Sequence, residues 1–455
     1  MDVKGKHVLV FGTGKSGIGA AGLLHHEQAK VILYDGNAKQ DPEEIRRKLD
    51  AGADVEIILG ELSDEVLDRL ELVVLSPGVP ADLPVVLKMK EKEIPVWGEV
   101  ELAYRVGKGE VLAITGTNGK TTTTSLLGEI MKAYRKDVQV VGNIGTAYTS
   151  VALDTTEDTV TVAEISSFQL ETIEKFHPKA SAITNITEDH LNRHHTMEEY
   201  IRVKERITEN QTMEDVCVLN YEDEVLRAFG EKLIREQKVQ VLFFSSLRAL
   251  QDGIYCQDGT IWLAGNGERE PVVRTDELKI LGQHNYENVM TAVGMAYYAG
   301  VPMDVIRKAV CAFQGVEHRI EYVCEKNSVV YYNDSKGTNP DAAIKGIQAM
   351  NRPTLLIGGG YDKQSTYESW IRAFDHKVKY LVLIGETREK IAETARREGF
   401  REILMADNLE EAVKICADKA EPGDAVLLSP ACASWDQFDS YEQRGDLFKE
   451  YVRAL

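Results

Sequence analysis

The stretch VLAITGTNGKTTTT, residues 111–124, decides the fold class of this chain. Its first five residues are apolar or small and are typical of a buried strand, and the loop after them leads into the helical pattern TTSLLGEIMKAY. Backbone N–H groups at such a helix start bind phosphates. Two residues separate the loop glycines, where a standard Walker A motif has four. The stretch therefore predicts an ATP site in an α/β domain, with a lysine for the phosphates and a threonine for Mg²⁺.

The same arrangement, a short apolar run that ends in glycine or small polar residues, recurs along the whole chain. Further runs lie at 7–14, 30–36, 72–78, 94–100, 161–170, 180–190, 329–339, 353–363, 379–387 and 424–438. Helical stretches separate the runs, so they predict buried parallel strands in βαβ units. We expect an α/β chain of three domains with boundaries near residues 97 and 315: a Rossmann-like N-terminal domain (1–97), a central P-loop-type ATP-binding domain (98–315) and a Rossmann-like C-terminal domain (316–455).

Composition limits the partners and the compartment. The 455 residues suit about three domains. With 53 Lys and Arg against 73 Asp and Glu, the net charge of −20 gives no general field for nucleic acid or an anionic membrane. The six cysteines form no C-x-x-C pair, and no apolar stretch is long enough to span a membrane. We find no signal peptide pattern and expect a cytoplasmic protein.

A second glycine loop, GTGKSG (12–17), follows the first strand and precedes a helical stretch. Asp35 ends the next strand, 18 residues after Gly17. This is the fingerprint of a dinucleotide site, in which glycines let the backbone approach, helix N–H groups bind a pyrophosphate and a carboxylate binds a ribose. The pattern fits NAD and a UDP-linked substrate equally, and a strand–helix turn without a ligand is the alternative. SPG (76–78) either lines the same cleft or forms a plain turn.

Two motifs downstream of the phosphate loop offer ligands for a metal ion. Glu164 ends a strand where a Walker-B acid would lie, or it is an exposed charge at a strand end. His190 follows the next strand at the same edge of the sheet. The spacing of His190, His194 and His195 matches no zinc pattern, and we expect the last two at the surface.

Lys204 belongs to the predicted helix EYIRVKERITEN (199–210). The helix follows the capping-box pattern TMEE (196–199). Glu205 and Arg206 come directly after the lysine, so the residues alone indicate a solvated, charged helix face.

Polar residues are dense in the last third of the chain. GQHNYEN (282–288) opens a helix with two asparagines on one face, which bind adenine or ribose or simply cap the helix. Arg319 lies at a predicted domain boundary, from which it can reach a phosphate. NDSKGTN (333–339) and SPACASWDQF (429–438) each follow a strand and suit a site that binds a carboxylate and a nucleotide together.

These motifs, in this order, resemble those of the Mur ligases, the ATP-dependent amide-forming enzymes of peptidoglycan synthesis. The resemblance spans essentially the whole chain and rests on GTNGKTT, EISSFQL, TEDHLNRH, the helix with Lys204, GQHNYEN and the pair His318-Arg319. SPG, NDSKGTN and SPACASWDQF look like the member that adds D-glutamate to UDP-N-acetylmuramoyl-L-alanine. The chain departs from the pattern at Gly337, where alanine is common, and at Gly36, where a hydroxyl residue is usual.

The resemblance implies a reaction and its cofactors. ATP phosphorylates the alanyl carboxylate to an acyl phosphate, the amine of D-glutamate attacks, and the tetrahedral intermediate collapses to amide, ADP and phosphate. The implied cofactors are ATP, two Mg²⁺ ions and a CO₂-derived carbamate on Lys204. The implied partners are the UDP-linked substrate and D-glutamate, with no nucleic acid and no membrane insertion, and we expect a monomer.

By the same resemblance, matched position by position, the site residues fall into five groups. The catalytic residues would be Lys120, Lys204, His190 and Lys336. ATP would be bound by Gly116, Thr117, Asn118, Gly119, Lys120, Thr121, Thr122, Asn285, Asn288, Arg319 and Asp334. The UDP-linked substrate would be bound by Gly14, Lys15, Ser16, Asp35, Ser76, Gly78 and Asn143. D-Glutamate would be bound by Thr338, Lys363, Ser434 and Tyr441. The metal ligands would be Thr121, Glu164, His190 and the carbamate of Lys204.

Three alternatives remain open. Within the class, the chain could be another Mur ligase or a ligase similar to folylpolyglutamate synthase, which shares the ATP core. The first glycine loop alone also fits an NAD(P)-dependent oxidoreductase, although that function leaves the second loop, Glu164 and His190 without a role. A non-catalytic nucleotide sensor would bind ATP without forming a product.

Overall fold

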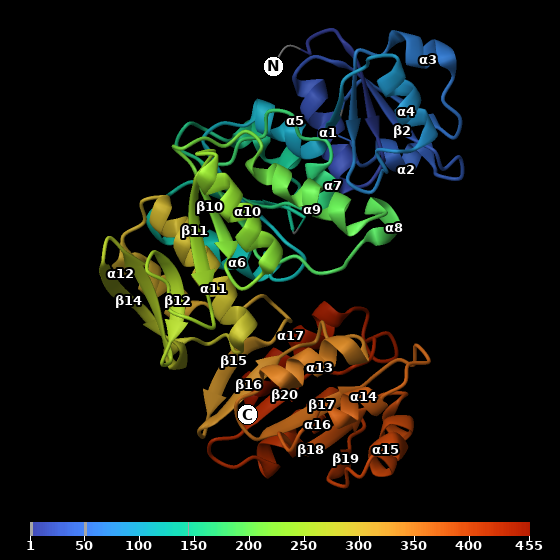
Figure 1. The fold of residues 1–455 in the computed structure, drawn as a ribbon. Coiled ribbons are helices and arrows are strands. Elements are labelled where there is room, and N and C mark those ends of the chain that lie inside the picture. Colours follow the sequence, from blue (N-terminus) through green and yellow to red (C-terminus); the bar gives the residue numbers. More distant parts are fainter. Residues whose placement is uncertain (1–2, 50–51, 144) are drawn as a thin grey trace. The chain divides into compact units, whose positions relative to one another are not determined.

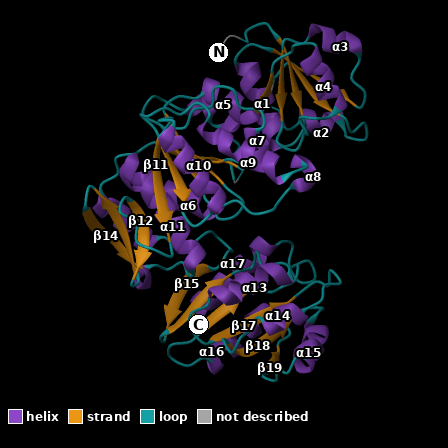
Figure 2. Cartoon of the chain, in the orientation of Figure 1, coloured by secondary structure: helices purple, strands orange, loops and turns teal. Residues whose placement is uncertain are grey.

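The computed structural model describes residues 3–49, 52–143 and 145–455, and these form a mixed α/β structure with three sheets (Figures 1 and 2). They group into two compact units. Unit 1 contains the residues up to 272 together with 287–309, and unit 2 contains 273–286 and 310–455. The predicted fold class is confirmed. The predicted domain boundaries, near residues 97 and 315, remain predictions.

The first sheet of unit 1 is parallel and has the strand order β3-β2-β1-β4-β5. Its strands are β1 (His7–Phe11), β2 (Lys30–Asp35), β3 (Val55–Leu59), β4 (Leu72–Leu75) and β5 (Val96–Gly98). The helices of this part are α1 (Lys15–His26), α2 (Pro42–Arg46), α3 (Asp64–Arg69), α4 (Pro84–Glu91) and α5 (Glu99–Val106). The apolar run of β1 is continuous because both of its faces are buried: Val8 packs into one core and Leu9 into another. The order reverses between β1 and β4, which brings the loops after these two strands together.

The second sheet of unit 1 has the order β14-β13-β12-β11-β10-β9-β6-β8-β7. Its strands are β6 (Glu110–Thr115), β7 (Val138–Gly142), β8 (Val160–Glu164), β9 (Ala180–Ile183), β10 (Val216–Asn220), β11 (Gln240–Ser245), β12 (Gly253–Gln257), β13 (Thr260–Gly265) and β14 (Glu268–Arg274). The accompanying helices are α6 (Lys120–Tyr134), α7 (Ser167–Leu170), α8 (Leu191–His194), α9 (Met197–Glu205), α10 (Glu224–Arg235), α11 (Gln283–Tyr298) and α12 (Met303–Ala312). Strand β6 lies between β8 and β9, parallel to both, so the loops after all three meet at one sheet edge.

The sheet of unit 2 has the order β15-β16-β20-β17-β18-β19. Its strands are β15 (Glu321–Lys326), β16 (Val329–Asn333), β17 (Thr354–Gly359), β18 (Val378–Ile384), β19 (Ile403–Met405) and β20 (Ala425–Leu428). Its helices are α13 (Pro340–Ala349), α14 (Glu368–Arg372), α15 (Arg388–Arg397), α16 (Leu409–Lys419) and α17 (Tyr441–Ala454). Strands β15 and β16 pair antiparallel, and the pairs β16–β20, β20–β17, β17–β18 and β18–β19 are parallel. Since β16 and β20 are neighbours, the two polar loops that follow them lie side by side.

Each apolar run singled out in the sequence contains a strand, and the phosphate loop leads into α6 as predicted. Strands outside these runs were not predicted, among them β10 and the antiparallel pair β12–β13; β13 is only partly buried and therefore carries a weaker apolar pattern than a buried strand. Among the helices of the described residues, none combines the length and the apolar character that crossing a membrane requires.

Candidate functional site

One cavity of about 860 Å³ in unit 1 is lined by every residue predicted to bind the UDP-linked substrate. These residues are Gly14, Lys15, Ser16, Asp35, Ser76, Gly78 and Asn143. A cavity of this size suits a nucleotide-sized ligand. The turn at its wall requires glycine, because a Cβ on Gly17 would lie 1.8 Å from the carbonyl oxygen of Gly12.

Asp35 brings a carboxylate to this cavity. Its Oδ2 accepts a hydrogen bond from Thr13 Oγ1 at 2.9 Å, and its Oδ1 accepts one from the Asn37 N–H at 3.0 Å. Burial alone would raise the pKa of Asp35, but hydrogen bonds from Asn37, Thr13 and Gln40 hold it below its usual value. The group is therefore ionised near neutral pH, as a ligand for ribose hydroxyls must be.

The phosphate loop, residues 116–119, is held in place by its neighbours. Gly119 has a φ of +84°, and a Cβ there would lie 2.3 Å from Asn288 Oδ1. The Asn118 N–H donates to Asn185 Oδ1 at 2.9 Å. Thr121 and Thr122 follow in the first turn of α6, where backbone N–H groups have no partner within the helix. This arrangement is suited to an anion.

Lys120 folds back over the phosphate loop. Its Nζ donates to the carbonyl oxygens of Gly116 and Thr117, at 2.9 Å each. The ammonium group therefore lies on the loop itself, where a P-loop lysine meets phosphate oxygens.

Lys204 is buried, so its interpretation as part of a solvated face is wrong. The residue is 1% exposed, and its Nζ donates to the carbonyl oxygen of Gly116 at 2.8 Å. Burial, and then the charge of Lys120, lowers the pKa of Lys204 to about 7. Helix α9 buries Tyr200, Val203 and Lys204 together. This i, i+3, i+4 spacing is the signal in the sequence that could have indicated burial.

Glu164 is also buried, at 1% exposure, so it is not an exposed charge at a strand end. Asn143 Nδ2 donates to its Oε1 at 2.9 Å. The other oxygen, Oε2, is buried and has no hydrogen-bond partner among the described residues. A buried carboxylate oxygen without a donor is costly. A divalent cation would satisfy it, so this residue fits the role of a Mg²⁺ ligand.

The three histidines around α8 differ in environment. The His190 side chain, which precedes α8, is 49% exposed. His194 is buried, against our expectation of a surface residue: its Nε2 lies 2.9 Å from Ser167 Oγ, and burial lowers its pKa to about 4. The His195 side chain is 70% exposed, as expected. His190 and His195 are thus both open to solvent, and His190 is the one of the two that was predicted to bind a metal ion.

The predicted metal ligands come from separate elements of unit 1: Thr121, Glu164, His190 and Lys204. In the described part of the chain, a group of three acidic and histidine side chains has its ligand atoms within 4.8 Å of one another, and it consists of Glu317, His318 and Asp446 of unit 2. Lys449 Nζ lies 2.7 Å from Glu317 Oε1 and 3.1 Å from Asp446 Oδ1. Lys449 thus already pairs with both carboxylates of this cluster, which we interpret as an ion-pair network.

In unit 2, Asp334 connects the loops after β16 and β20. Its N–H donates to the carbonyl of Leu428 at 2.7 Å, and its Oδ2 accepts from Ser429 Oγ at 2.7 Å. Burial raises the pKa of Asp334 to about 7, although Ser429 and the Ile320 N–H donate to it. This predicted ATP-binding carboxyl therefore titrates close to neutral pH.

Arg444 joins the same two loops and was not singled out from the sequence. It is fully buried; its Nε donates to Ser335 Oγ at 3.0 Å, its Nη2 to the Ser335 carbonyl at 2.8 Å, and both Nη atoms to the Cys432 carbonyl at 3.2 Å. Burial lowers its pKa to about 10, which leaves it charged at neutral pH. One guanidinium thus fixes the loop of Lys336 against that of Ser434. A single arginine in a charged stretch has no periodic signal, which is why the sequence did not indicate it.

The residues predicted to bind D-glutamate all belong to unit 2: Thr338, Lys363, Ser434 and Tyr441. Lys363 Nζ lies 4.7 Å from the centroid of the Trp435 ring, and Lys336 Nζ lies 5.5 Å from that of Tyr441. Aromatic faces stabilise a cation without cancelling its charge. The aromatic contact of Lys363 therefore leaves its ammonium charge available to attract a carboxylate.

The remaining predicted ATP residues divide between the units. Asn288 is in unit 1, beside the phosphate loop, and its Oδ1 accepts from Thr123 Oγ1 at 3.3 Å. Asn285 is in unit 2 and donates from Nδ2 to the Leu281 carbonyl at 2.7 Å. Arg319 is also in unit 2.

Replacement of Asp334 by asparagine is expected to change the pH dependence of stability. The native pKa of about 7 lies above the ordinary value of 3.8, so the folded chain holds this proton more tightly. The resulting stabilisation is complete below about pH 4 and is lost as the pH rises through about 7. Relative to Asp334→Asn, the wild type should therefore lose free energy of unfolding across that range. Urea unfolding at several pH values measures the difference, with exposed Asp341→Asn as the control; a pH-independent difference would contradict it.

Models of the Mur ligase family match three parts of the chain. The Mur ligase MurD-like, N-terminal domain matches residues 6–98, the Mur ligase middle domain matches 114–296, and the Mur ligase, glutamate ligase domain matches 318–432. These stretches contain the substrate-cavity loops, the phosphate loop and the loop after β16, respectively.

Curated relatives match over the full length. The UDP-N-acetylmuramoylalanine--D-glutamate ligase of Lachnoclostridium phytofermentans is 59% identical over 100% of this chain and 99% of its own. The ligases of the same name from Lachnospira eligens and Clostridioides difficile are 55% and 44% identical, each over 100% of both chains.

Solved structures with the same fold are more distant in sequence. A UDP-N-acetylmuramoyl-L-alanyl-D-glutamate--2,6-diaminopimelate ligase has a TM-score of 0.59 at 19% identity, covering 93% of this chain and 92% of its own. The UDP-N-acetylmuramate-alanine ligase of Thermotoga maritima has a TM-score of 0.55 at 19% identity, covering 99% of both chains. At these identities the likeness concerns the fold.

Proposed function

The chain belongs to the Mur ligase family, and we propose that it uses ATP to join D-glutamate to UDP-N-acetylmuramoyl-L-alanine in peptidoglycan synthesis. The observation that carries the proposal is the 59% identity, over the full length, to a ligase named for this reaction. As a Mur ligase, the chain is an ATP-dependent enzyme that uses Mg²⁺. The products are an amide, ADP and phosphate.

The UDP end of the substrate would lie in the cavity of about 860 Å³. Loop N–H groups around Gly14, Lys15 and Ser16 would bind the pyrophosphate, and ionised Asp35 would accept hydrogen bonds from the ligand. Asn143 lines this cavity and also donates to Glu164. It would therefore connect the end of the substrate that carries the reacting carboxylate to the predicted metal ligand.

The triphosphate of ATP would lie on the phosphate loop. Backbone N–H groups of the loop and Lys120 would offset the phosphate charge while the alanyl carboxylate attacks the terminal phosphorus. Bringing these anions together is the main electrostatic cost of the step, so preorganised cations should contribute most to catalysis. Mg²⁺ supplies further positive charge on the phosphate oxygens when bound. We assign Thr121, Glu164, His190 and a carbamate on Lys204 to two such ions.

The carbamate assignment is supported by the environment of Lys204. The neutral amine nitrogen attacks the carbon of CO₂, an N–C bond forms as one C=O π bond becomes a C–O⁻, and one proton leaves the nitrogen, so a neutral amine becomes an anionic carbamate; starting from the ammonium form, a second proton must leave first. Only a neutral amine can do this. With a pKa of about 7, roughly half of the Lys204 amines are neutral at pH 7, against fewer than about one in a thousand for an ordinary lysine.

The amino-acid substrate would bind to unit 2. Lys363, with Thr338, Ser434 and Tyr441, would bind the carboxylates of D-glutamate and orient its amine toward the acyl phosphate. Asn285, Asn288, Arg319, Asp334 and Lys336 would complete the ATP site, the last two also at the reacting centre. Asp334 and the loop of Lys336 are held by Ser429 and Arg444.

The domain organisation and the oligomeric state follow from this assignment of residues to the three substrates. We propose three domains at 1–97, 98–315 and 316–455, acting as a cytoplasmic monomer because one chain supplies residues for all three substrates. The family-model matches at 6–98, 114–296 and 318–432 support the division.

An amino-acid scan tests the function. Phosphate release is measured with ATP, Mg²⁺ and UDP-N-acetylmuramoyl-L-alanine, and we expect turnover with D-glutamate but not with L-glutamate, L-alanine or meso-diaminopimelate. Turnover with another amino acid instead would indicate a different member of the family. Binding of ATP without any product would indicate a sensor, and NADH binding would favour the oxidoreductase.

A further inference from the structure

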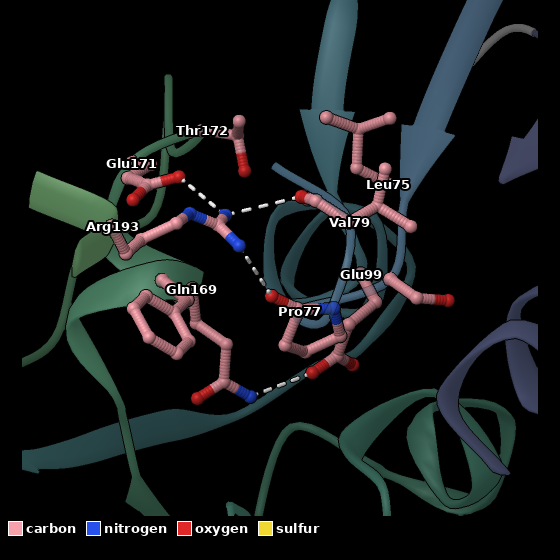
Figure 3. A pocket seen from close by; sticks show the side chains of 11 residues that line it. Leu75, Pro77, Val79, Glu99, Gln169, Glu171, Thr172 and Arg193 are labelled. Atoms are coloured by element: carbon pink, nitrogen blue, oxygen red, sulfur yellow. Dashed lines mark hydrogen bonds and ion pairs between the residues drawn. The ribbon is translucent and has the colours of Figure 1, made fainter. Parts of the chain in front are cut away.

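Arg193 of α8 connects the substrate loop, residues 76–79, to the segment that contains α7 and α8 (Figure 3). Its Nη2 donates to the Val79 carbonyl at 3.1 Å and to Glu171 Oε2 at 2.7 Å, and its Nη1 lies 3.5 Å from the Pro77 carbonyl oxygen. The Arg193 side chain is 12% exposed. Hydrogen bonds from a guanidinium are stronger than those between neutral groups, and partial burial shields them from water.

The same guanidinium packs against Phe168 of α7. Its central carbon lies 4.5 Å from the centroid of the Phe168 ring. The ring of His190 lies 4.9 Å from that of Phe168, and the ring of His194 lies 5.5 Å from it. The N–H groups of Arg193 therefore contact the substrate loop, and the face of its guanidinium contacts the Phe168 ring, which lies beside His190.

A small cavity of about 10 Å³ lies beside this contact (Figure 3). Its walls include Ser76, Glu99, Gln169 and Arg193. Ser76 Oγ and Glu99 Oε2 are buried without a hydrogen-bond partner among the described residues, while Gln169 Nε2 donates to Glu99 Oε1 at 2.7 Å. The cavity is about the size of one water. The base of the substrate loop thus borders unpaired polar groups, and Arg193 supplies direct hydrogen bonds to the loop.

We propose that Arg193 is a positioning residue that holds the substrate loop in register with His190. The proposal rests on the proposed function, in which Ser76 and Gly78 bind the UDP-linked substrate and His190 a metal ion. The substrate loop follows strand β4 of the first sheet, and His190 follows strand β9 of the second sheet. The phosphate loop belongs to the second sheet as well, so a link between the substrate loop and the His190 segment sets the distance from the bound substrate to the phosphate loop. A displacement of about 1 Å at a reacting centre costs roughly a hundredfold in rate.

Arg193→Gln and Arg193→Lys test the proposal. Glutamine removes the charge, and lysine keeps it as a point charge that cannot reproduce the planar set of bonds. For both we expect the KM for UDP-N-acetylmuramoyl-L-alanine to rise roughly tenfold and kcat to fall by a similar factor, with the KM for ATP changed less than about twofold. Calorimetry should show the same weakening for this substrate and none for ADP.

His195→Ala is the matched control. His195 lies two positions further along and contacts Asp82 through an exposed pair, with Nε2 and Oδ2 3.2 Å apart. Exposed pairs contribute little, so we expect wild-type kinetics.

The outcomes separate this proposal from the proposed function. If the wild type turns over D-glutamate but both Arg193 variants bind the UDP-linked substrate with unchanged affinity, the positioning role is overturned and the proposed function stands. So would an equal loss of affinity for all ligands together with a lower melting temperature, since that indicates a general structural role. If the wild type shows no turnover of D-glutamate, but Arg193→Gln still selectively weakens binding of the UDP-linked substrate, the proposed function is overturned and the positioning role is supported.

Discussion

Lys204→Ala is expected to lower kcat by roughly 10²–10³-fold while ATP still binds with an affinity within about threefold of wild type. The side chain is buried against the Gly116 carbonyl, at the edge of the sheet where the phosphate loop begins. If it carries a carbamate, alanine removes an anionic ligand for Mg²⁺. The ATP contacts of the phosphate loop itself remain. Steady-state phosphate release and calorimetry with a nucleotide measure the two effects separately.

Two matched variants and one spectrum control for other causes. Arg202 lies on the same helix and has an exposed side chain paired with Glu199, so Arg202→Ala should behave as wild type. Lys204→Arg keeps a cation but cannot form the carbamate, so it should be as inactive as Lys204→Ala. With ¹³C-labelled bicarbonate, a carbamate resonance should be present in the wild type and absent from both Lys204 variants.

Short carboxylates give a further test of the same idea. Formate or acetate added to Lys204→Ala can occupy the space left by the side chain and should restore part of the activity. Substantial activity of Lys204→Ala without such an addition would show that the carbamate is dispensable.

The fold could be predicted well because its strands are buried on both faces. Such strands appear in the sequence as continuous apolar runs that end at polar loops, and the runs at 7–11 and 111–115 both form interior strands of their sheets, β1 and β6. The antiparallel pair β12–β13 was not predicted, since β13 is only partly buried and its apolar pattern is correspondingly weak. The grouping of the first two sheets into one unit depends on contacts between distant segments, which a single sequence does not reveal.

The site could be predicted only where function depends on local geometry. A glycine loop before a helix forms its phosphate site within a few residues, so the loop at 116–119 was visible. Arg444 acts on Ser335, 109 residues away, and Arg193 acts on Pro77, 116 residues away. Lys204 and His194 were misjudged for a related reason: charged and polar residue types suggest exposure, and only the packing shows that these two are buried.

The net charge of −20 makes the placement of individual cations decisive. UDP, ATP and glutamate are all anionic, and the protein as a whole repels them. Lys120 is bonded to carbonyl oxygens, and Lys363 lies over the Trp435 ring. Carbonyl dipoles and aromatic rings hold a cation without cancelling its charge, unlike a carboxylate. We therefore expect activity to depend on these lysines far more than on exposed ones.

Lys120→Ala is the sharpest case of this dependence, and we expect it to lower kcat/KM for ATP by roughly 10³-fold. The variant loses the ammonium group at the phosphates and two hydrogen bonds within the loop, to the carbonyls of Gly116 and Thr117. Lys132→Ala is the control, because Lys132 is an exposed residue of the same helix, paired with Glu129. Near-normal turnover of Lys120→Ala would exclude the lysine from the ATP site.

Lys120→Ala should also reduce the formation of the carbamate on Lys204. The charge of Lys120 contributes, after burial, to the low pKa of Lys204, and both ammonium groups donate to the Gly116 carbonyl. Without Lys120 the pKa of Lys204 should rise, fewer amines would be neutral at pH 7, and the ¹³C carbamate signal should weaken and recover at higher pH. The effects of Lys120→Ala and Lys204→Ala should therefore not add in the double variant. An undiminished carbamate signal in Lys120→Ala would show that burial alone sets the state of Lys204.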